Sequence, residues 1–275
     1  MTRYLPQTLL SSTRNQRIQA AAALRDRRAR EETGLTLVDG ARELSRALAA
    51  GVRVVEVFVD PAKVGAAGAQ IVVDNARAQG AAIVPVAPSV LDHLAYGDRA
   101  EGLVATVAVP DLSPSALVLP EDPLVVVLEG VEKPGKLGAV LRTADGAGAN
   151  AVLASDPRTD LFNPNAIRAS MGTIFAMPLA SGPGPEIRAR LDAGGIRLVA
   201  ARVDGAVPYM DLDLRGPLAI VLGSEADGLT DAWSGAEVIA VRLPMLGAAD
   251  SLNVSIAAAV LLYEARRQRG LPARR

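Results

Sequence analysis

The chain has 275 residues, half of them apolar, and a formal net charge of −1. It contains no cysteine and one histidine, His93, which excludes disulfides, thiolate metal sites and histidine-based triads. No apolar run approaches the roughly 20 residues that span a bilayer, so we expect a cytoplasmic protein without a membrane partner. Any chemistry is expected to depend on Arg, Asn, Ser and carboxylates, without a metal.

The first 30 residues carry a concentrated positive charge. They hold seven arginines against one carboxylate, Asp26, which is a local charge of +6. A basic segment of this kind is either a nucleic-acid-binding surface or the solvated face of a helix. Composition leaves both interpretations open.

Residues 1–109 alternate between helical and extended patterns, which predicts a small α/β domain. A long helix is expected over Arg14–Glu32, where helix propensity is high and Gly34 follows as a stop. The other expected helices are 41–50, 66–79 and 90–94, and the expected strands are 35–38, 53–59, 82–86 and 103–109. Residues 110–123 contain four prolines, so we expect an extended linker there.

Residues 124–275 repeat the alternation and predict a second α/β domain with a parallel sheet. Its expected strands are 124–128, 151–154, 197–201, 218–222 and 238–241, and its expected helices are 138–148, 165–171, 185–193, 230–234 and 252–269. The last helix is apolar on nearly every face from Val254 to Tyr263. It should therefore be buried on more than one side, under its own sheet and against a second subunit.

A glycine-rich turn follows the first strand of this second domain. Residues Gly130 to Lys136 spell glycine, four residues, glycine and lysine, as in a phosphate-binding loop. The next residue is Leu137, which lacks the hydroxyl that such loops use to bind magnesium. A nucleoside triphosphate is therefore a poor match, and the turn needs another ligand.

Three loops each follow an apolar strand, which is where α/β sheets collect ligands. They are the glycine-rich turn with Arg142 beyond it, the loop 223–229, and the loop 243–247 that leads into 250–255. Taken singly, each has a structural interpretation. Arg142 can be a surface residue of a helix, Glu225 a helix cap, and Asp250 or Ser251 an N-cap of the last helix.

Together the loops resemble the three motifs of the SpoU (TrmH) family of RNA 2′-O-ribose methyltransferases. The motifs are Leu-Gly-Ala-Val-Leu-Arg-Thr-Ala at 137–144, Val-Leu-Gly-Ser-Glu-Ala-Asp-Gly-Leu at 221–229, and Leu-Pro-Met at 243–245 with Ser-Leu-Asn-Val-Ser-Ile at 251–256. Residues 11–18 and 34–44 also resemble the ribosomal-protein-like RNA-binding domain of many family members. That domain normally has Glu where this chain has Asp39.

The resemblance implies an α/β fold in which the second domain is a parallel sheet tied in a deep trefoil knot. The smaller N-terminal α/β domain, 1–109, is then expected to bind the RNA substrate, 110–123 is a linker, and 124–275 is the knotted methyltransferase domain. The implied cofactor is S-adenosyl-L-methionine. The implied partners are RNA, ribosomal RNA in particular, and a second copy of the chain in a homodimer formed through the knotted domain.

The resemblance also assigns residues. The positions that match the family's cofactor-binding residues are Leu222, Gly223, Glu225, Gly228, Leu243, Pro244, Met245, Ser251, Leu252 and Asn253. The positions expected to take part in catalysis are Arg142, Glu225, Ser251 and Asn253. The expected RNA-binding residues are Arg14, Arg17, Lys136 and Arg168.

Arg142 matches the arginine that the family is thought to use on the ribose hydroxyl. An arginine stays protonated, so we expect Arg142 to grip a phosphate and stabilise the developing alkoxide, not to act as a general base. One position departs from the family, because Lys136 stands where the first motif has Asn. Lys136 is expected to contact RNA phosphate, and the alternative is a catalytically weak protein that binds cofactor and RNA.

Overall fold

The computed structural model describes residues 9–65, 69–96, 102–224 and 227–270. The chain divides into two compact units. The first comprises Met1–Pro110 together with Phe162–Ala176, and the second comprises Asp111–Leu161 and Met177–Arg275. The expected domain boundaries stay a prediction. The units depart from them in the internal segment 162–176, which belongs to the first unit, and in the expected linker, which belongs to the second unit from Asp111 on.

The first unit contains a four-stranded mixed sheet in the order β1-β4-β2-β3. Strand β4 is antiparallel to β1 and to β2, whereas β2 and β3 are parallel. The strands are β1 (Leu35–Asp39), β2 (Val54–Val59), β3 (Ala82–Pro85) and β4 (Leu103–Ala108). An α/β domain in this part of the chain is confirmed.

The helices of this unit are α1 (Gln16–Ala23), α2 (Arg27–Thr33), α3 (Ala41–Ala49), α4 (Ala69–Ala78) and α5 (Pro88–Leu94). The single helix expected over Arg14–Glu32 was wrong, since the chain breaks between α1 and α2. The buried guanidinium of Arg30 donates to the carbonyls of Leu24 and Arg25, at 2.7 and 2.8 Å. These bonds satisfy carbonyls that a continuous helix would have used itself, and they stabilise the turn.

Two short helices from the middle of the chain, α7 (Pro164–Ala169) and α8 (Thr173–Ala176), also belong to the first unit. The Thr36 hydroxyl donates to the Phe162 carbonyl at 2.7 Å, and Arg46 donates to the carbonyl of Met171. Both contacts satisfy backbone groups of the inserted segment. These side chains therefore fix the segment to β1 and α3.

The second unit is built on a seven-stranded sheet in the order β7-β6-β5-β10-β8-β11-β9, and every pairing in it is parallel. The strands are β5 (Leu124–Glu129), β6 (Ala151–Ser155), β7 (Leu179–Gly182), β8 (Arg197–Ala201), β9 (Val207–Pro208), β10 (Leu218–Leu222) and β11 (Val238–Arg242). The central strands β5 and β10 are buried along their whole length, as apolar runs in parallel sheets require. The parallel α/β sheet is confirmed, and the knotted path of the chain stays a prediction.

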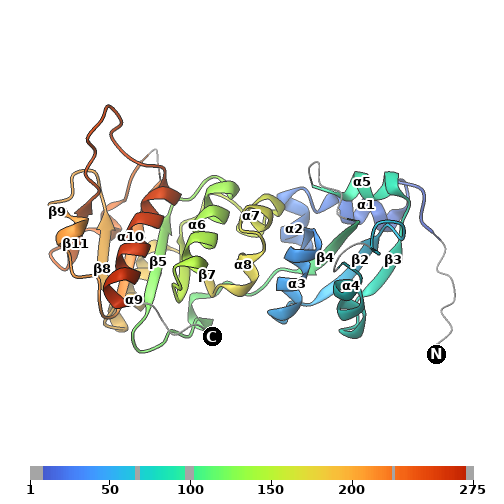
Figure 1. Ribbon diagram of the computed structural model, residues 1–275, viewed down its shortest axis with the longest axis horizontal. Helices are drawn as coiled ribbons and strands as arrows, with labels where there is room; N and C mark the ends of the chain where they lie inside the picture. Colours follow the sequence, from blue (N-terminus) through green and yellow to red (C-terminus); the bar gives the residue numbers. More distant parts are fainter. Residues whose placement is uncertain (1–8, 66–68, 97–101, 225–226, 271–275) are drawn as a thin grey trace. The chain divides into compact units, whose positions relative to one another are not determined.

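Helices cover both faces of this sheet. Helices α6 (Pro134–Gly146) and α10 (Val254–Arg269) pack against each other on one face, where Figure 1 shows them side by side. The opposite face packs against α9 (Gly184–Ala193) and the buried Trp233 of the short helix η3 (Asp231–Trp233). Two further short helices are η1 (Pro114–Ala116) and η2 (Tyr209–Asp211).

Helix α6 begins at Pro134, four residues before the expected start at Gly138. Proline fits the first position of a helix because its missing N–H would have no partner there. Lys136 therefore lies in the first turn of α6, and Arg142 lies about two turns along it. None of the described helices combines the length and apolar character that crossing a bilayer would require.

Candidate functional site

A cavity of about 460 Å³ lies in the second unit where β8, β10 and β11 end. The carboxyl ends of parallel strands are the usual place for ligands in such sheets. The lining residues are Ala201–Asp204, Leu222–Ser224, Asp227–Leu229, Val241, Leu243, Met245, Asp250–Leu252, Val254 and Ala257. We call this the larger cavity.

The loop after β10 closes on itself at the edge of the larger cavity. Ser224 and Gly228 exchange two backbone hydrogen bonds of 3.1 Å, and the N–H of Asp227 donates to the Ser224 hydroxyl at 3.0 Å. A Cβ on Gly223 would lie 2.3 Å from the backbone of Gly228. The close approach of the two chain segments therefore requires glycine at position 223.

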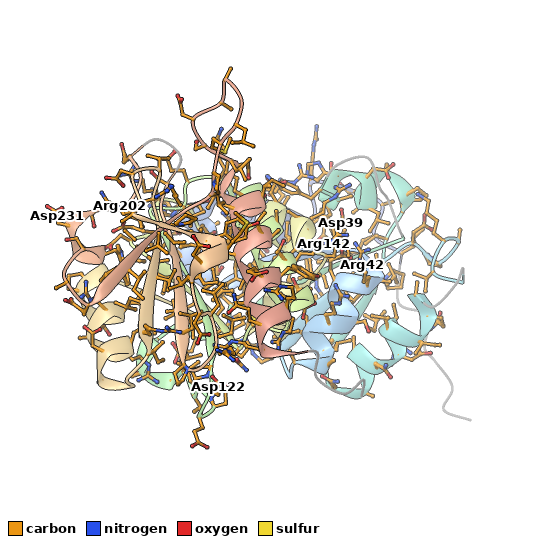
Figure 2. All side chains as sticks on the ribbon, turned by 60° about the vertical axis from the view of Figure 1, so that its left-hand side comes forward. Asp39, Arg42, Asp122, Arg142, Arg202 and Asp231 are labelled. Carbon is orange, nitrogen blue, oxygen red and sulfur yellow. The ribbon has the colours of Figure 1, made fainter. Side chains whose placement is uncertain are left out.

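The loop after β8 forms another wall. A Cβ on Gly205 would lie 2.6 Å from the Val241 backbone, so this loop packs directly on the end of β11. Arg202 donates to the Asp204 carboxylate at 2.9 Å; this bond raises the pKa of Arg202 and lowers that of Asp204. In Figure 2, Arg202 and Asp231 lie beside each other at one end of the strands, and Asp122 lies at the other end.

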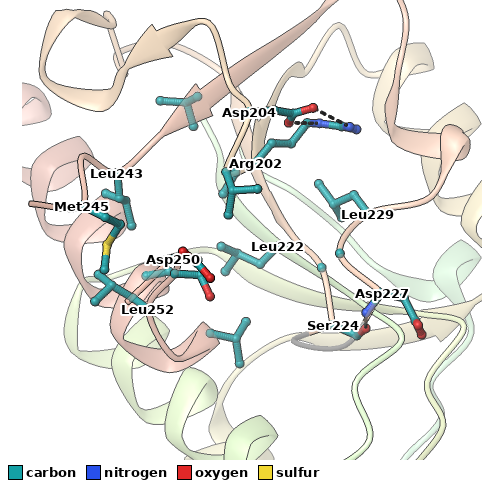
Figure 3. Close-up of a pocket in the computed structure, with 18 residues that line it drawn as sticks. Arg202, Asp204, Leu222, Ser224, Asp227, Leu229, Leu243, Met245, Asp250 and Leu252 are labelled. Atoms are coloured by element: carbon teal, nitrogen blue, oxygen red, sulfur yellow. Dashed lines mark hydrogen bonds and ion pairs between the residues drawn. The ribbon is translucent and has the colours of Figure 1, made fainter. Parts of the chain in front are cut away.

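Figure 3 shows how the larger cavity combines apolar and acidic groups. Leu243, Met245 and Leu252 lie on one side, Leu229 lies on the opposite side, and the Asp250 carboxylate points into the space between them. Apolar walls with a few polar groups are typical of sites for small organic ligands. Arg202 also lines the cavity and is bonded to Asp204, so it is the Asp250 carboxylate in this lining that favours a ligand with positive charge.

A smaller cavity of about 300 Å³ adjoins the larger one. It is lined by residues 128–133 at the end of β5 and just beyond it, by Lys136 and Val140 of α6, and by Gly223, Ser224 and Val254, which the two cavities share. Two lysines, Lys133 and Lys136, therefore line a space that shares a wall with the larger cavity.

Two polar contacts join the loops around the smaller cavity. Buried Glu129 accepts hydrogen bonds from the backbone N–H and the hydroxyl of Thr230, at 2.8 and 2.6 Å. Closer to solvent, Arg158 is bonded to Glu132 at 2.7 Å and to Asp227 at 2.8 Å. Both contacts connect the loop after β5 with the loop after β10.

Comparison with protein families identifies the chain. A model described as the SpoU rRNA Methylase family matches residues 123–263, and one described as the MRM3-like substrate binding domain matches residues 15–105. The chain belongs to the SpoU rRNA methylase family. The family resemblance expected from the sequence is confirmed, including the N-terminal substrate-binding domain.

Two curated relatives illustrate the family. The 23S rRNA (uridine(2479)-2′-O)-methyltransferase of Streptomyces viridochromogenes is 32% identical over 266 residues, which cover 94% of this chain and 92% of that protein. The 23S rRNA (guanosine-2′-O-)-methyltransferase RlmB of Bordetella pertussis is 36% identical over 205 residues, which cover 73% of this chain and 84% of that protein. The two relatives methylate different nucleosides.

Two solved structures share the fold over nearly the whole chain. A crystal structure of an RNA 2′-O ribose methyltransferase has a TM-score of 0.83 and 39% identity, covering 95% of this chain and 99% of that one. An AdoMet-bound rRNA methyltransferase from Sinorhizobium meliloti has a TM-score of 0.86 and 28% identity, covering 94% of this chain and 97% of that one. Both matches extend over residues of the two units described above.

The family's cofactor positions gather around the larger cavity. Seven of the ten positions line it: Leu222, Gly223, Gly228, Leu243, Met245, Ser251 and Leu252. Pro244 is exposed next to this wall, and Glu225 lies outside the described residues. Asn253 is the N-cap of α10, where its side-chain oxygen accepts from the N–H and the hydroxyl of Ser255, at 3.0 and 2.8 Å. The assigned roles stay predictions.

Arg142 lies apart from both cavities of its own chain. It is exposed on α6, and the residues that line the two cavities do not include it. The expected catalytic residues Ser251 and Asn253 are, in contrast, next to the larger cavity. Within one chain, the structure therefore does not bring Arg142 together with the other expected catalytic residues.

The residues expected to bind RNA have different surroundings. Arg14 is exposed, Arg17 forms an ion pair with Glu56, and Arg168 donates to the carbonyl of Tyr96 within the first unit. Lys136 lines the smaller cavity. Many of the N-terminal arginines contact groups of their own unit. Arg27 and Arg28 form ion pairs with Glu31 and Glu32, and Arg25 and Arg30 donate to backbone carbonyls.

Sequence reasoning missed four polar residues of the site: Glu129, Arg158, Arg202 and Asp204. Arg202 and Asp204 directly follow the apolar strand β8, which is the signal that pointed to the other loops. Glu129 ends a buried apolar strand, and a carboxylate in that position is a signal for a specific partner. Arg158 follows the apolar strand β6 in the same way.

Proposed function

We propose that the protein transfers the methyl group of S-adenosyl-L-methionine to a ribose 2′-hydroxyl of 23S rRNA. The observation that carries the proposal is the larger cavity, which is lined by seven of the ten family cofactor positions and shares a wall with a second cavity. The relatives from Streptomyces and Bordetella act on 23S rRNA, which supports the same substrate class here. An rRNA substrate also supports a cytoplasmic location.

The residues of the larger cavity fit S-adenosyl-L-methionine. The apolar wall of Leu243, Met245 and Leu252 suits the uncharged parts of the cofactor, and the Asp250 carboxylate suits a cationic group. When bound, the cofactor supplies an electrophilic methyl group on a sulfonium. The protein then contributes binding and orientation, because an in-line displacement depends mostly on how the reactants are held.

The smaller cavity is proposed as the site of the acceptor nucleotide. Gly223 and Ser224 line both cavities, so a ribose there would meet the methyl group at this shared wall. Lys133 and Lys136 line the same space and carry charges that complement RNA phosphate. The lysine at position 136, which departs from the family, is therefore proposed as an RNA contact.

The protein is proposed to act as a homodimer through the second unit, which is also proposed to contain the deep trefoil knot. Large apolar side chains remain exposed in the single chain, with Leu246 99%, Ile256 51% and Tyr263 54% exposed. Ile256 and Tyr263 lie seven residues apart on α10 and therefore point in similar directions. A second copy would cover them, in agreement with the all-round apolar character of this helix.

Arg142 is proposed to serve the acceptor site of the partner subunit. It is exposed and lines neither cavity of its own chain, so a second copy is the simplest way to bring it to a site. There its guanidinium would hold an RNA phosphate and stabilise charge on the ribose oxygen. The proton would leave through that phosphate or through water, since an arginine cannot accept it.

The test is methyl transfer from tritiated S-adenosyl-L-methionine to RNA by the full-length protein. Protein-free 23S rRNA, assembled 50S subunits and transfer RNA would be compared, and the labelled ribose would be mapped by resistance to alkaline hydrolysis. We expect label in 23S rRNA at one ribose. Label in a base, in transfer RNA alone or in no RNA would contradict the proposal.

A further inference from the structure

Arg158 connects two loops that are far apart in the sequence. It lies after β6, and one of its terminal nitrogens, Nη1, is 2.7 Å from a carboxylate oxygen of Glu132 and 2.8 Å from one of Asp227. Its own backbone N–H donates to the carbonyl of Val131 at 2.9 Å. Arg158 is thus fixed to the loop after β5 and reaches the loop after β10.

This bridge lies at the junction of the two cavities. Glu132 lines the smaller cavity and Asp227 lines the larger one. The backbone of Gly130, which also lines the smaller cavity, is so close that an added Cβ would lie 4.0 Å from Arg158 Nε. The three charged side chains therefore border the region where the two cavities meet.

The bridge keeps two like charges in place. Glu132 and Asp227 are both within hydrogen-bond distance of the same nitrogen, so without Arg158 their carboxylates would repel each other. Their hydrogen bonds, that of Glu132 first and that of Asp227 second, hold the pKa of Arg158 above its ordinary value. The side chains of Arg158, Glu132 and Asp227 are 55%, 45% and 57% exposed, so salt screens the contact.

We propose that Arg158 is a positioning residue for methyl transfer, because it holds the loop after β5 and the loop after β10 at the spacing that aligns the two cavities. The proposal rests on the proposed function of these cavities. Arg158 acts through Glu132 and Asp227 and need not touch cofactor or RNA. Its loss is therefore expected to lower kcat more than it weakens the binding of RNA.

The exposed pair Arg215–Asp213 provides a matched comparison. Arg215 is bonded to Asp213 at 2.9 Å, but the two residues are neighbours in one loop and line neither cavity. An exposed pair of this kind usually contributes little. Arg215→Ala removes the same charge and the same type of contact without changing the distance between the two loops.

The test compares Arg158→Ala, Arg158→Lys and Arg215→Ala in the full-length protein. Misplacing reacting groups by about 1 Å can cost up to about a hundredfold in rate, so we expect Arg158→Ala to lower kcat by about tenfold or more. KM for RNA should change by less than about threefold, because a single exposed charge contributes modestly to the binding of RNA. Affinity for S-adenosylhomocysteine, measured by titration calorimetry, should fall by about threefold as the Asp227 loop loosens.

A charge exchange makes the test specific. Arg158→Asp combined with Asp227→Arg restores one attraction between the two loops and should recover part of the kcat that either single change removes. Raising the salt concentration should lower kcat of the wild type more than that of Arg158→Ala. Circular dichroism and the unfolding midpoint of each variant would verify that the fold is kept.

Several results would overturn the positioning role. The first is an unchanged kcat in Arg158→Ala. The second is an increase in KM for RNA with kcat unchanged, which would make Arg158 an RNA contact. The third is an equal loss of kcat in Arg158→Ala and Arg215→Ala. If the wild type methylates no RNA, the proposed function fails on that observation alone. The calorimetric titration then still tests the positioning role of Arg158, because unchanged affinity for S-adenosylhomocysteine in Arg158→Ala would overturn that role.

Discussion

The carboxylate of Glu129 accepts two hydrogen bonds from Thr230, one from the backbone N–H at 2.8 Å and one from the hydroxyl at 2.6 Å. Glu129 is 6% exposed, so its buried oxygens need hydrogen-bond donors from the protein. We expect Thr230→Val, which removes the hydroxyl and keeps the N–H, to lower the free energy of unfolding by about 1–3 kcal/mol. Urea denaturation monitored by circular dichroism would measure this decrease in the free energy of unfolding.

Thr33 provides the control for this change. Its hydroxyl donates to the Ala29 carbonyl at 2.6 Å at an exposed helix end. Thr33→Val should therefore change the free energy of unfolding by less than about 0.5 kcal/mol. Equal effects of the two substitutions would show that the Glu129 carboxylate does not need the Thr230 hydroxyl.

Gly223 is expected to be indispensable for cofactor binding. An alanine Cβ there would lie 2.3 Å from the backbone of Gly228, so Gly223→Ala must push apart the loop that borders the larger cavity. We expect affinity for S-adenosylhomocysteine to fall by at least about a hundredfold, which corresponds to about 3 kcal/mol of lost binding energy. Calorimetric titration would measure this loss.

Gly135→Ala is the matched substitution on the same unit. Gly135 lies in the first turn of α6, lines neither cavity, and an added Cβ would meet nothing within 4 Å. Because alanine favours the helix, the stability should rise by up to about 1 kcal/mol with cofactor affinity unchanged. Normal binding by Gly223→Ala would contradict the close approach of the two loop segments.

The acid stability of the second unit is expected to depend on Glu264. Hydrogen bonds from Arg267 and then from Gln268 lower the pKa of Glu264 from 4.5 to about 2. A carboxylate with a lowered pKa in the folded state contributes stability above its unfolded pKa and loses it as the pH falls. The stabilisation by Glu264 should therefore be complete above about pH 4.5 and disappear between pH 4.5 and 2.

Glu264→Gln tests this dependence. The variant should be less stable than the wild type at pH 7, and the difference should shrink steadily between pH 4.5 and 2. Urea unfolding at a series of pH values would measure it, with Glu31→Gln, a partner of Arg27 on α2, as the control for losing an exposed carboxylate. A difference that stays constant down to pH 2 would refute the role of Glu264.

The sheets were predictable where a strand is a continuous apolar run. Leu124–Leu128 and Leu218–Leu222 were placed correctly, because buried parallel strands need apolar residues on both faces. Strands β7 and β9 were not predicted, since β7 has only three small residues after Leu179 and β9 has two residues in all. Both lie at the edges of the sheet, where pairing demands little of the sequence.

The candidate site was predictable as a set of loops and much less as a network of contacts. The Glu129–Thr230 contact joins residues 101 positions apart, and it exists because β5 and β10 are neighbours, with Leu128 beside Leu222. Sequence patterns gave both strands but not their order in the sheet. The Arg158 bridge joins the loops after β5 and β10 and depends on the same strand order, so its partners could not be predicted. Arg202 and Asp204, in contrast, follow β8 and carried the same signal as the other loops.

Arg142 is expected to act on the cavities of the partner subunit. Arg142→Ala should lower kcat for methyl transfer by about a hundredfold or more, since it removes a group that stabilises developing charge. Affinity for S-adenosylhomocysteine should stay unchanged, because Arg142 lines neither cavity of its own chain. Rate measurements and calorimetric titration on the same preparation would separate the two effects.

Mixed dimers decide between action in the same subunit and action on the partner. Arg142→Ala and Gly223→Ala proteins with different affinity tags would be produced together, and the dimers that carry both tags would be purified. If Arg142 serves the partner, the Gly223→Ala subunit supplies its Arg142 to the intact cavities of the Arg142→Ala subunit, and activity returns. If Arg142 serves its own chain, both sites of the mixed dimer are defective, and the mixed dimer is as inactive as either parent. Tyr263→Asp, which puts a charge on the exposed face of α10, should abolish the recovery by separating the subunits.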